Sequence, residues 1–180
     1  MIKEFSVHAK PRNNNAKIFF LIGISISALV FILSLMIESY KGVVGFAALL
    51  MITTSILIYT KYVAVDFYYD ITFDYNEAPV FVVRQVTGKR ATTLCRIEIA
   101  DIDSVQYVTK KDKSKELKEK GVKRYIYTPT LFPPDCFRIF ASNRYEKYEL
   151  VIECSSEFAE LLVQYSKEAK ENRILEDNEE

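Results

Sequence analysis

Three aspartates, at positions 66, 70 and 74, are the first residues whose type and spacing suggest chemistry. On a helix, a spacing of four would place the three carboxylates on one face, where they could bind a metal ion. The segment 65–75 instead alternates large apolar and polar residues, which is the period of a β-strand. The alternation therefore predicts a strand whose aspartates form its water-facing side, and no metal is expected there.

Other catalytic arrangements would depend on the single histidine and the three cysteines. His8 precedes the apolar part of the chain and is far in sequence from the serines and cysteines that follow, which argues against a Ser–His or Cys–His pair. Cys95, Cys136 and Cys154 show no metal-ligand spacing and are expected to be small buried hydrophobes. The sequence also lacks a glycine-rich phosphate-binding motif. We therefore expect a protein that is not an enzyme and that binds no cofactor.

A lysine-rich stretch at 110–124 is the strongest local charge, with eight basic and three acidic residues. A lysine or arginine near an anionic membrane surface contributes about 1 kcal/mol to binding. One hypothesis is contact with anionic lipid headgroups, and the other is a solvated loop. The lipid hypothesis uses Lys89, Arg90, Lys110, Lys111, Lys113, Lys115, Lys118, Lys120, Lys123 and Arg124. A formal net charge of zero and the lack of interleaved aromatic residues argue against nucleic acid as a partner.

A Leu–Phe pair, Leu131 and Phe132, lies in the proline-rich stretch 128–135, which is predicted to form a rigid turn. If the pair were exposed, it would be a small apolar patch of the kind that contacts a protein partner. Packing back onto the domain or into the membrane interface is the alternative. All three interpretations stay open from the residues alone.

The elements that position these residues begin with two apolar stretches, 18–37 and 42–62. Neither Ile18–Ile37 nor Gly42–Thr60 contains a charged residue, and each has about the ~20 residues that span a bilayer. The first stretch carries small residues at 23, 27 and 34, and the second carries small residues at 48, 53 and 55 that could face them. This pattern predicts close packing of the two helices. Basic residues flank the outer ends of the hairpin, which predicts a multi-pass plasma-membrane protein with both termini in the cytoplasm.

After the hairpin, alternation and turn residues predict seven strands followed by one amphipathic helix. The strands are expected at 65–75, 80–86, 92–99, 104–108, 123–127, 137–141 and 148–154. A serine at 155 or 156 would cap the helix, and apolar residues then recur at helical spacings. The expected organisation is a cytoplasmic tail at 1–17, a hairpin at 18–63, a domain at 65–171 and a disordered acidic tail at 172–180.

Several segments, in this order, carry a resemblance: 69–72 (Tyr-Asp-Ile-Thr), 82–84 (Val-Val-Arg), 88–90 (Gly-Lys-Arg), 94–99, 101–105, and the helical 157–162. On these segments the chain resembles bacterial membrane proteins with a pleckstrin-homology-like (PH-like) domain. The resemblance implies a membrane α-hairpin plus an α+β domain, in which a seven-stranded antiparallel bent sheet or barrel is capped by a C-terminal helix. The chain lacks the dense basic loop of inositol-lipid-binding members, so that activity is not expected.

Two functions follow as expectations. The first is a membrane-anchored interaction or scaffold module at the cytoplasmic face, which would bind a protein partner or a second copy of itself. The second is a module that responds to anionic lipid through the lysine-rich loop 110–124. Neither the partner nor the pathway follows from the residues.

Overall fold

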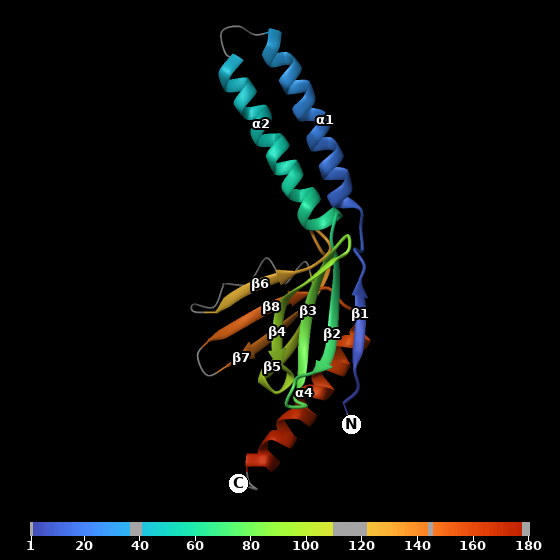
Figure 1. Cartoon of the computed structure of the whole chain (residues 1–180). Helices are drawn as coiled ribbons and strands as arrows, with labels where there is room; N and C mark the ends of the chain where they lie inside the picture. Colours follow the sequence, from blue (N-terminus) through green and yellow to red (C-terminus); the bar gives the residue numbers. More distant parts are fainter. Residues whose placement is uncertain (1, 37–40, 110–121, 144–145, 178–180) are drawn as a thin grey trace. The chain divides into compact units, whose positions relative to one another are not determined.

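The computed structural model describes residues 2–36, 41–109, 122–143 and 146–177. Contacts divide the chain into two units (Figure 1). The hairpin unit comprises Pro11–Val65 and Thr130–Phe132. The sheet domain comprises Met1–Lys10, Asp66–Pro129 and Pro133–Glu180.

The hairpin unit is formed by α1 (Asn15–Met36) and α2 (Lys41–Ile58), and α2 continues as a short π-helical segment, η1 (Tyr59–Val63). Both helices are long and apolar enough to cross a membrane, and their large side chains face outward. The predicted small-residue seam is confirmed for Ser27, Ser34, Ala48 and Ser55, which are all buried. Thr53 is the exception. It is exposed and donates its hydroxyl hydrogen bond to the Leu49 carbonyl on its own helix.

Gly23 lies at a close approach of the two helices. A Cβ atom at this position would lie 2.3 Å from the Ser55 hydroxyl oxygen, whereas one at Gly45 would meet no heavy atom within 4 Å. We expect Gly23→Leu to destabilise the hairpin by about 1–3 kcal/mol, because overpacking forces the helices apart. Detergent-induced unfolding followed by helical circular dichroism would measure this. Gly45→Leu is the matched control, and equal effects of the two variants would contradict the close-packing argument.

The first sheet of the domain has the order β1-β2-β3-β4 and is antiparallel throughout. Its strands are β1 (Phe5–Ala9), β2 (Asp66–Phe73), β3 (Pro79–Thr87) and β4 (Arg90–Glu98). The sequence predicts a polar tail for 1–17, whereas in the structure Phe5–Ala9 form an edge strand. This short strand is stabilised by β2, which follows it only after the whole hairpin, so no local pattern could reveal the pairing.

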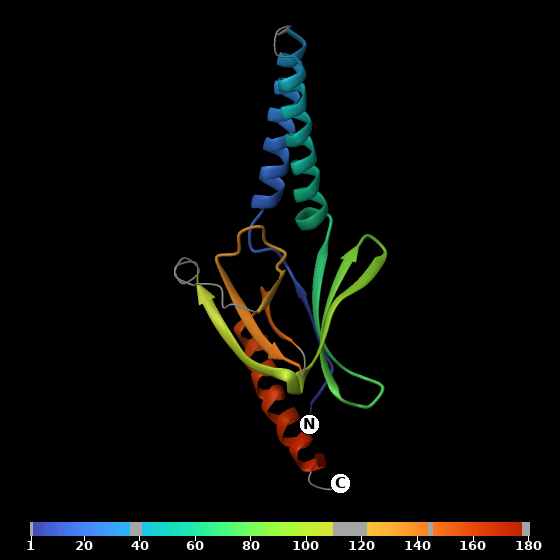
Figure 2. The same cartoon turned by 90° about the vertical axis from the view of Figure 1, so that its left-hand side faces the viewer.

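The second sheet has the order β5-β7-β8-β6. Its strands are β5 (Ile102–Thr109), β6 (Lys123–Tyr127), β7 (Asp135–Ser142) and β8 (Lys147–Ile152). A 3₁₀ turn, η2 (Ile99–Asp101), carries the chain from β4 to β5 (Figure 2). The seven strands predicted after the hairpin are all present, but they form two sheets together with β1. The prediction of a wholly antiparallel arrangement is wrong, because β6 pairs in parallel with β8. The long 128–134 connection lets the chain step over one strand position before β7, and β8 occupies the gap.

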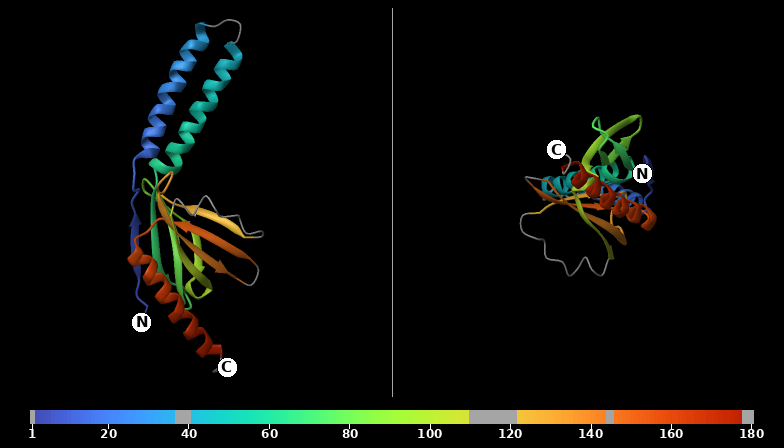
Figure 3. Two further views of the ribbon diagram at one scale, coloured as in Figure 1. Left: turned by 180° about the vertical axis from the view of Figure 1, so that it is seen from behind. Right: turned by 90° about the horizontal axis from the view of Figure 1, so that it is seen from below.

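The closing helix, α4 (Ser156–Asp177), lies between the two sheets (Figure 3). As predicted, a serine caps it, since the Phe158 amide donates to the Ser155 hydroxyl oxygen at 3.3 Å. Phe158 is buried against Tyr69 and Phe81, with ring centroids 6.4 and 6.3 Å away. The helix continues past residue 172, where the sequence predicts a disordered tail. Arg173 explains this extension, because it binds Glu98 and the Asp101 carboxylate, the latter at 2.9 Å.

Candidate functional site

The basic residues of the lipid hypothesis have different surroundings. Lys89 and Arg90 are exposed at the β3–β4 turn, where Gly88 has a φ of 59° that favours glycine. Lys123 and Arg124 bind Glu146 and Glu149 of the sheet domain, each at 2.6 Å. The remaining six candidates, Lys110, Lys111, Lys113, Lys115, Lys118 and Lys120, lie outside the described residues. Among the four candidates that the structure describes, the charge available for lipid contact is therefore mainly that of Lys89 and Arg90.

A buried ion cluster lies across the second sheet, and no sequence pattern indicated it. The Glu149 carboxylate on β8 lies 2.6 Å from Arg124 on β6 and 3.1 Å from Arg138 on β7. The side chains of Glu149 and Arg138 are each only 6% exposed. Two guanidinium groups, on the strands that flank β8, thus share its carboxylate, which ties the three strands together.

Asp66 and Asp70 lie on β2, as predicted, and Asp74 directly follows its last residue, Phe73. The predicted water-facing side is confirmed for Asp66, which is exposed, but is wrong for Asp70, which is only 6% exposed. Each carboxylate pairs with a side chain of another strand. Asp66 lies 3.1 Å from the His8 ring nitrogen, Asp74 lies 2.7 Å from Arg96, and Asp70 binds Arg84. Among the described residues, no group of three potential ligands could hold a metal ion. The aspartates are therefore the acidic half of a cross-strand network.

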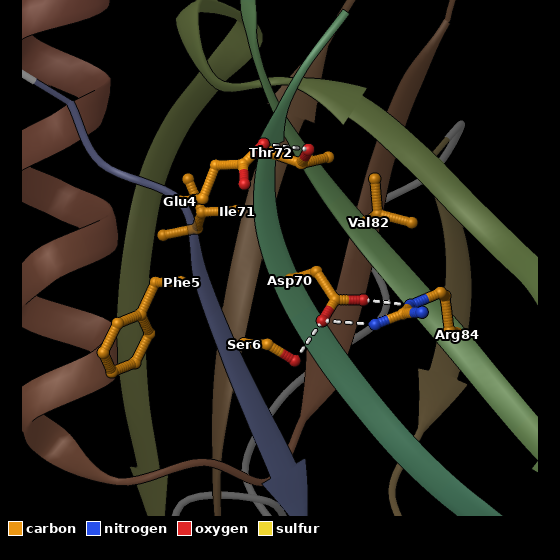
Figure 4. A pocket seen from close by; sticks show the side chains of 8 residues that line it. All are labelled: Glu4, Phe5, Ser6, Asp70, Ile71, Thr72, Val82 and Arg84. Carbon is orange, nitrogen blue, oxygen red and sulfur yellow. Dashed lines mark hydrogen bonds and ion pairs between the residues drawn. The ribbon is translucent and has the colours of Figure 1, made fainter.

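A hollow of about 440 Å³ opens beside this network, where β1, β2 and β3 meet (Figure 4). At its floor the Asp70 carboxylate accepts a 2.5 Å hydrogen bond from the Ser6 hydroxyl and two from Arg84. The hydrogen bond to Asp70 raises the pKa of Arg84 above its ordinary value. At the rim, the Thr72 hydroxyl donates to Glu4 at 3.1 Å. The residues lining the hollow are Glu4, Phe5, Ser6, Asp70, Ile71, Thr72, Val82 and Arg84.

His8 belongs to this face of the sheet, although the sequence places it far from the domain. β1 pairs with β2 so that His8 lies opposite Tyr68, and their rings stack at 4.7 Å. Proximity does not create a catalytic pair, because Ser6 and His8 contact different carboxylates. The Ser6 hydroxyl donates to a carboxylate that is already held by Arg84, and His8 contacts Asp66. These contacts, which we call the β1 latch, fasten the N-terminal strand to the domain.

The cysteines are free thiols, and two of them, Cys136 and Cys154, are buried as predicted. Cys95 is half-buried, and burial raises its pKa to about 11. Since only the thiolate reacts, alkylation of Cys95 in the folded protein should increase up to about pH 11, instead of levelling off near the ordinary thiol pKa of ~8.5. Iodoacetamide labelling read by peptide mass spectrometry measures this, with the urea-unfolded chain as the control. Rapid labelling of folded protein at neutral pH would contradict the burial argument.

Leu131 and Phe132 lie in the β6–β7 connection, and the structure groups them with the hairpin unit. The Phe132 ring contacts the Phe19 ring of α1 edge-on, with centroids 6.0 Å apart. Two residues before Phe132, the Thr130 hydroxyl oxygen accepts a hydrogen bond from the Arg12 amide at 3.0 Å. The predicted proline-rich turn is therefore present, and its tip packs beside the first turns of α1.

Comparison of the chain with protein-family models, curated proteins and solved structures gives no match. No residue role can therefore be transferred from a known protein. The surfaces that could carry function are the hollow beside the β1 latch, the β3–β4 turn and the tip of the β6–β7 connection.

Proposed function

We propose that this protein is a membrane-anchored, non-enzymatic interaction module that holds a PH-like domain at the cytoplasmic face of the plasma membrane. The pairing of β1 with β2 carries the proposal. β1 precedes α1 and β2 follows α2, and five residue pairs from Phe5↔Ile71 to Ala9↔Phe67 join them. If both helices span the bilayer, the two strands can pair only when they lie in the same compartment. The basic residues that flank the hairpin favour the cytoplasm.

Seven strands in chain order, followed by a helix packed into the sheet interior, support the PH-like assignment. The β1 strand and the parallel β6–β8 pair would be additions to that architecture. Because one fold serves many functions, this assignment alone does not specify a partner.

The hollow beside β1 is the surface that best suits a protein partner. β1 is at the end of the strand order of its sheet, so one row of its backbone groups does not pair within that sheet. An extended peptide can add to such an edge by main-chain hydrogen bonds, while neighbouring pockets select its side chains. Val82 and Arg84 would supply one apolar and one basic contact in the hollow.

Cysteine labelling in intact cells tests the anchoring. A membrane-impermeant maleimide should label Ser39→Cys, between the two helices, but should label Ser6→Cys only after lysis. Resistance of the chain to alkaline carbonate extraction should accompany this pattern. Labelling of Ser6→Cys from outside, or release by carbonate, would overturn the proposed anchoring.

Photo-crosslinking tests the partner surface. A photoreactive residue at Thr72, which lines the hollow, should capture a defined protein or a second copy. The matched control is Ser104, which is exposed on the second sheet. Identical products from both positions, or a Thr72 product that persists when Val7→Pro disrupts β1, would count against the hollow.

Contact with anionic lipid is the second candidate, favoured by the exposed Lys89–Arg90 turn. The turn begins just after Val86, which pairs with Asp66, the first residue of β2. Asp66 is also the first residue of the sheet domain after the hairpin in the sequence. Full-length protein in nanodiscs with anionic lipid should show slower hydrogen exchange at 87–91 than in neutral nanodiscs. Added salt and a Lys89→Gln, Arg90→Gln variant should each remove the difference. Equal exchange in both lipids at low salt would exclude this candidate.

A further inference from the structure

We propose that the Thr130–Phe132 tip of the β6–β7 connection is a lipid-contacting loop, which inserts Phe132 into the interfacial layer of the bilayer. The inference rests on the proposed function, because it needs the hairpin to be in a membrane. It assigns this tip to a lipid surface and not to a protein partner.

The first step is the location of the tip. Thr130–Phe132 belong to the hairpin unit, while the residues on either side of them belong to the sheet domain. The tip is held by the Arg12 amide, which donates to the Thr130 hydroxyl oxygen at 3.0 Å, and by the edge-on contact of Phe132 with Phe19. The Thr130–Phe132 segment therefore packs at the start of the first apolar helix, α1.

The second step is the depth of the contact. Phe19 lies four residues after the first residue of α1, which is about 6 Å along the helix axis. It is also the second residue of the uncharged stretch that begins at Ile18. A ring packed against Phe19 would thus lie at the boundary between headgroups and hydrocarbon, where the apolar part of α1 begins.

The third step is the composition of the surroundings. The Phe20 ring near the start of α1 and the Tyr59 ring at the start of η1 have centroids 4.9 Å apart, and the Lys61 Nζ atom lies 5.4 Å from the centroid of the Tyr62 ring. Aromatic rings with basic neighbours are typical of the membrane–water interface. Phe132, which lies outside the two helices, contacts Phe19, the residue before Phe20.

The fourth step is the exposure and rigidity of the tip. Phe132 is 62% exposed, although Pro129 and Thr130 beside it are buried. Prolines at 129, 133 and 134 restrict the backbone, and 125–134 contains no charged residue. A single aromatic side chain is therefore presented on a stiff, uncharged support, which suits insertion between lipids.

The chain contains no tryptophan, so a single introduced tryptophan is a clean depth probe. Three full-length variants are reconstituted in phosphatidylcholine vesicles whose lipids carry bromine at shallow or deep acyl positions. Phe132→Trp tests the inference, Leu29→Trp on the exposed face of α1 tests the hairpin, and Tyr75→Trp in the almost fully exposed β2–β3 turn is the aqueous control.

We expect shallow bromines to quench Trp at 132 most strongly, deep bromines to quench Trp at 29, and neither to quench Trp at 75. Aqueous iodide should show the reverse order. If Trp at 29 is quenched while Trp at 132 responds only to iodide, the loop is in water and the inference fails. A Trp at 132 that neither reagent reaches is buried in protein, which also overturns it. If Trp at 29 is not quenched, the proposed anchoring itself fails.

Discussion

Replacing Glu149 with glutamine should lower the free energy of unfolding of the sheet domain by about 3–5 kcal/mol, which is the cost of removing one partner from a buried ion pair. The carboxylate lies between Arg124 and Arg138, at 2.6 and 3.1 Å. Arg138 is the more vulnerable of the two, because its side chain is only 6% exposed and cannot regain water in the folded state. An amide of the same shape keeps the packing but leaves two positive charges without their counter-charge.

Urea unfolding of the full chain in mild detergent, followed by the circular dichroism of the sheets, measures this change. Glu146→Gln is the matched control, since Glu146 directly precedes β8 and forms an exposed ion pair of the same 2.6 Å length with Lys123, the first residue of β6. The midpoint of this control should not move, because water replaces the lost contact. Equal midpoints for Glu149→Gln and the unmodified chain would show that the buried cluster does not stabilise the sheet.

A second variant distinguishes two roles of the cluster, which are stabilising the sheet and selecting the order of its strands. Replacing all three charged residues by apolar ones of similar volume removes the desolvation cost together with the attraction, so the triple variant Arg124→Met, Glu149→Leu, Arg138→Met should be far less destabilised than Glu149→Gln. If the triple variant folds but the parallel pairing of β6 with β8 is lost, the charges select the strand order. Hydrogen exchange along β6 would report this.

The local elements of the domain could be predicted from the sequence because each depends on residues close to one another. The alternation of Phe67, Tyr69 and Ile71 with polar residues identifies β2 without knowledge of its neighbours. The small residues that face each other in the hairpin were visible in the same way. The prediction fails for Thr53, because a hydroxyl on an apolar helix can donate to its own backbone and point outward, as the Thr53 hydroxyl does to the Leu49 carbonyl.

The candidate sites could not be predicted because they join segments that are distant in sequence. The Ser6–Asp70 hydrogen bond connects residues on either side of the hairpin, and β1 is too short to be recognised without its partner. In the sequence, Glu149 is simply a polar residue of an alternating strand. Only the strand order shows that Arg124 and Arg138 both lie next to it. The sequence indicates Leu131 and Phe132 as a candidate contact, but the position of Phe132 beside Phe19 depends on the path of a proline-rich connection.

Tyr69→Phe should destabilise the domain by about 2–4 kcal/mol although it removes a single oxygen atom, because it removes the hydrogen bonds of one buried amide and one part-buried carbonyl. The Tyr69 hydroxyl donates to the Tyr127 carbonyl at 2.6 Å and accepts from the Glu153 amide at 3.2 Å. It therefore links the first sheet to the last residue of β6 and to the residue that directly follows β8. The ring is fully buried and would keep its packing against Phe81 and Phe158, so the loss measures the polar link alone.

Tyr127→Phe is the control, since that hydroxyl makes a longer, 3.5 Å contact with the Leu94 carbonyl and its removal should change stability little. A pH series adds an independent test. Burial raises the pKa of Tyr69 well above its ordinary value, so its contribution to stability is complete below about pH 10 and is lost as the pH rises further. The unmodified chain should thus lose more stability than Tyr69→Phe above pH 10, and the two urea midpoints should approach each other. A constant difference between them across the alkaline range would show that the hydroxyl does not link the sheets as the structure has it.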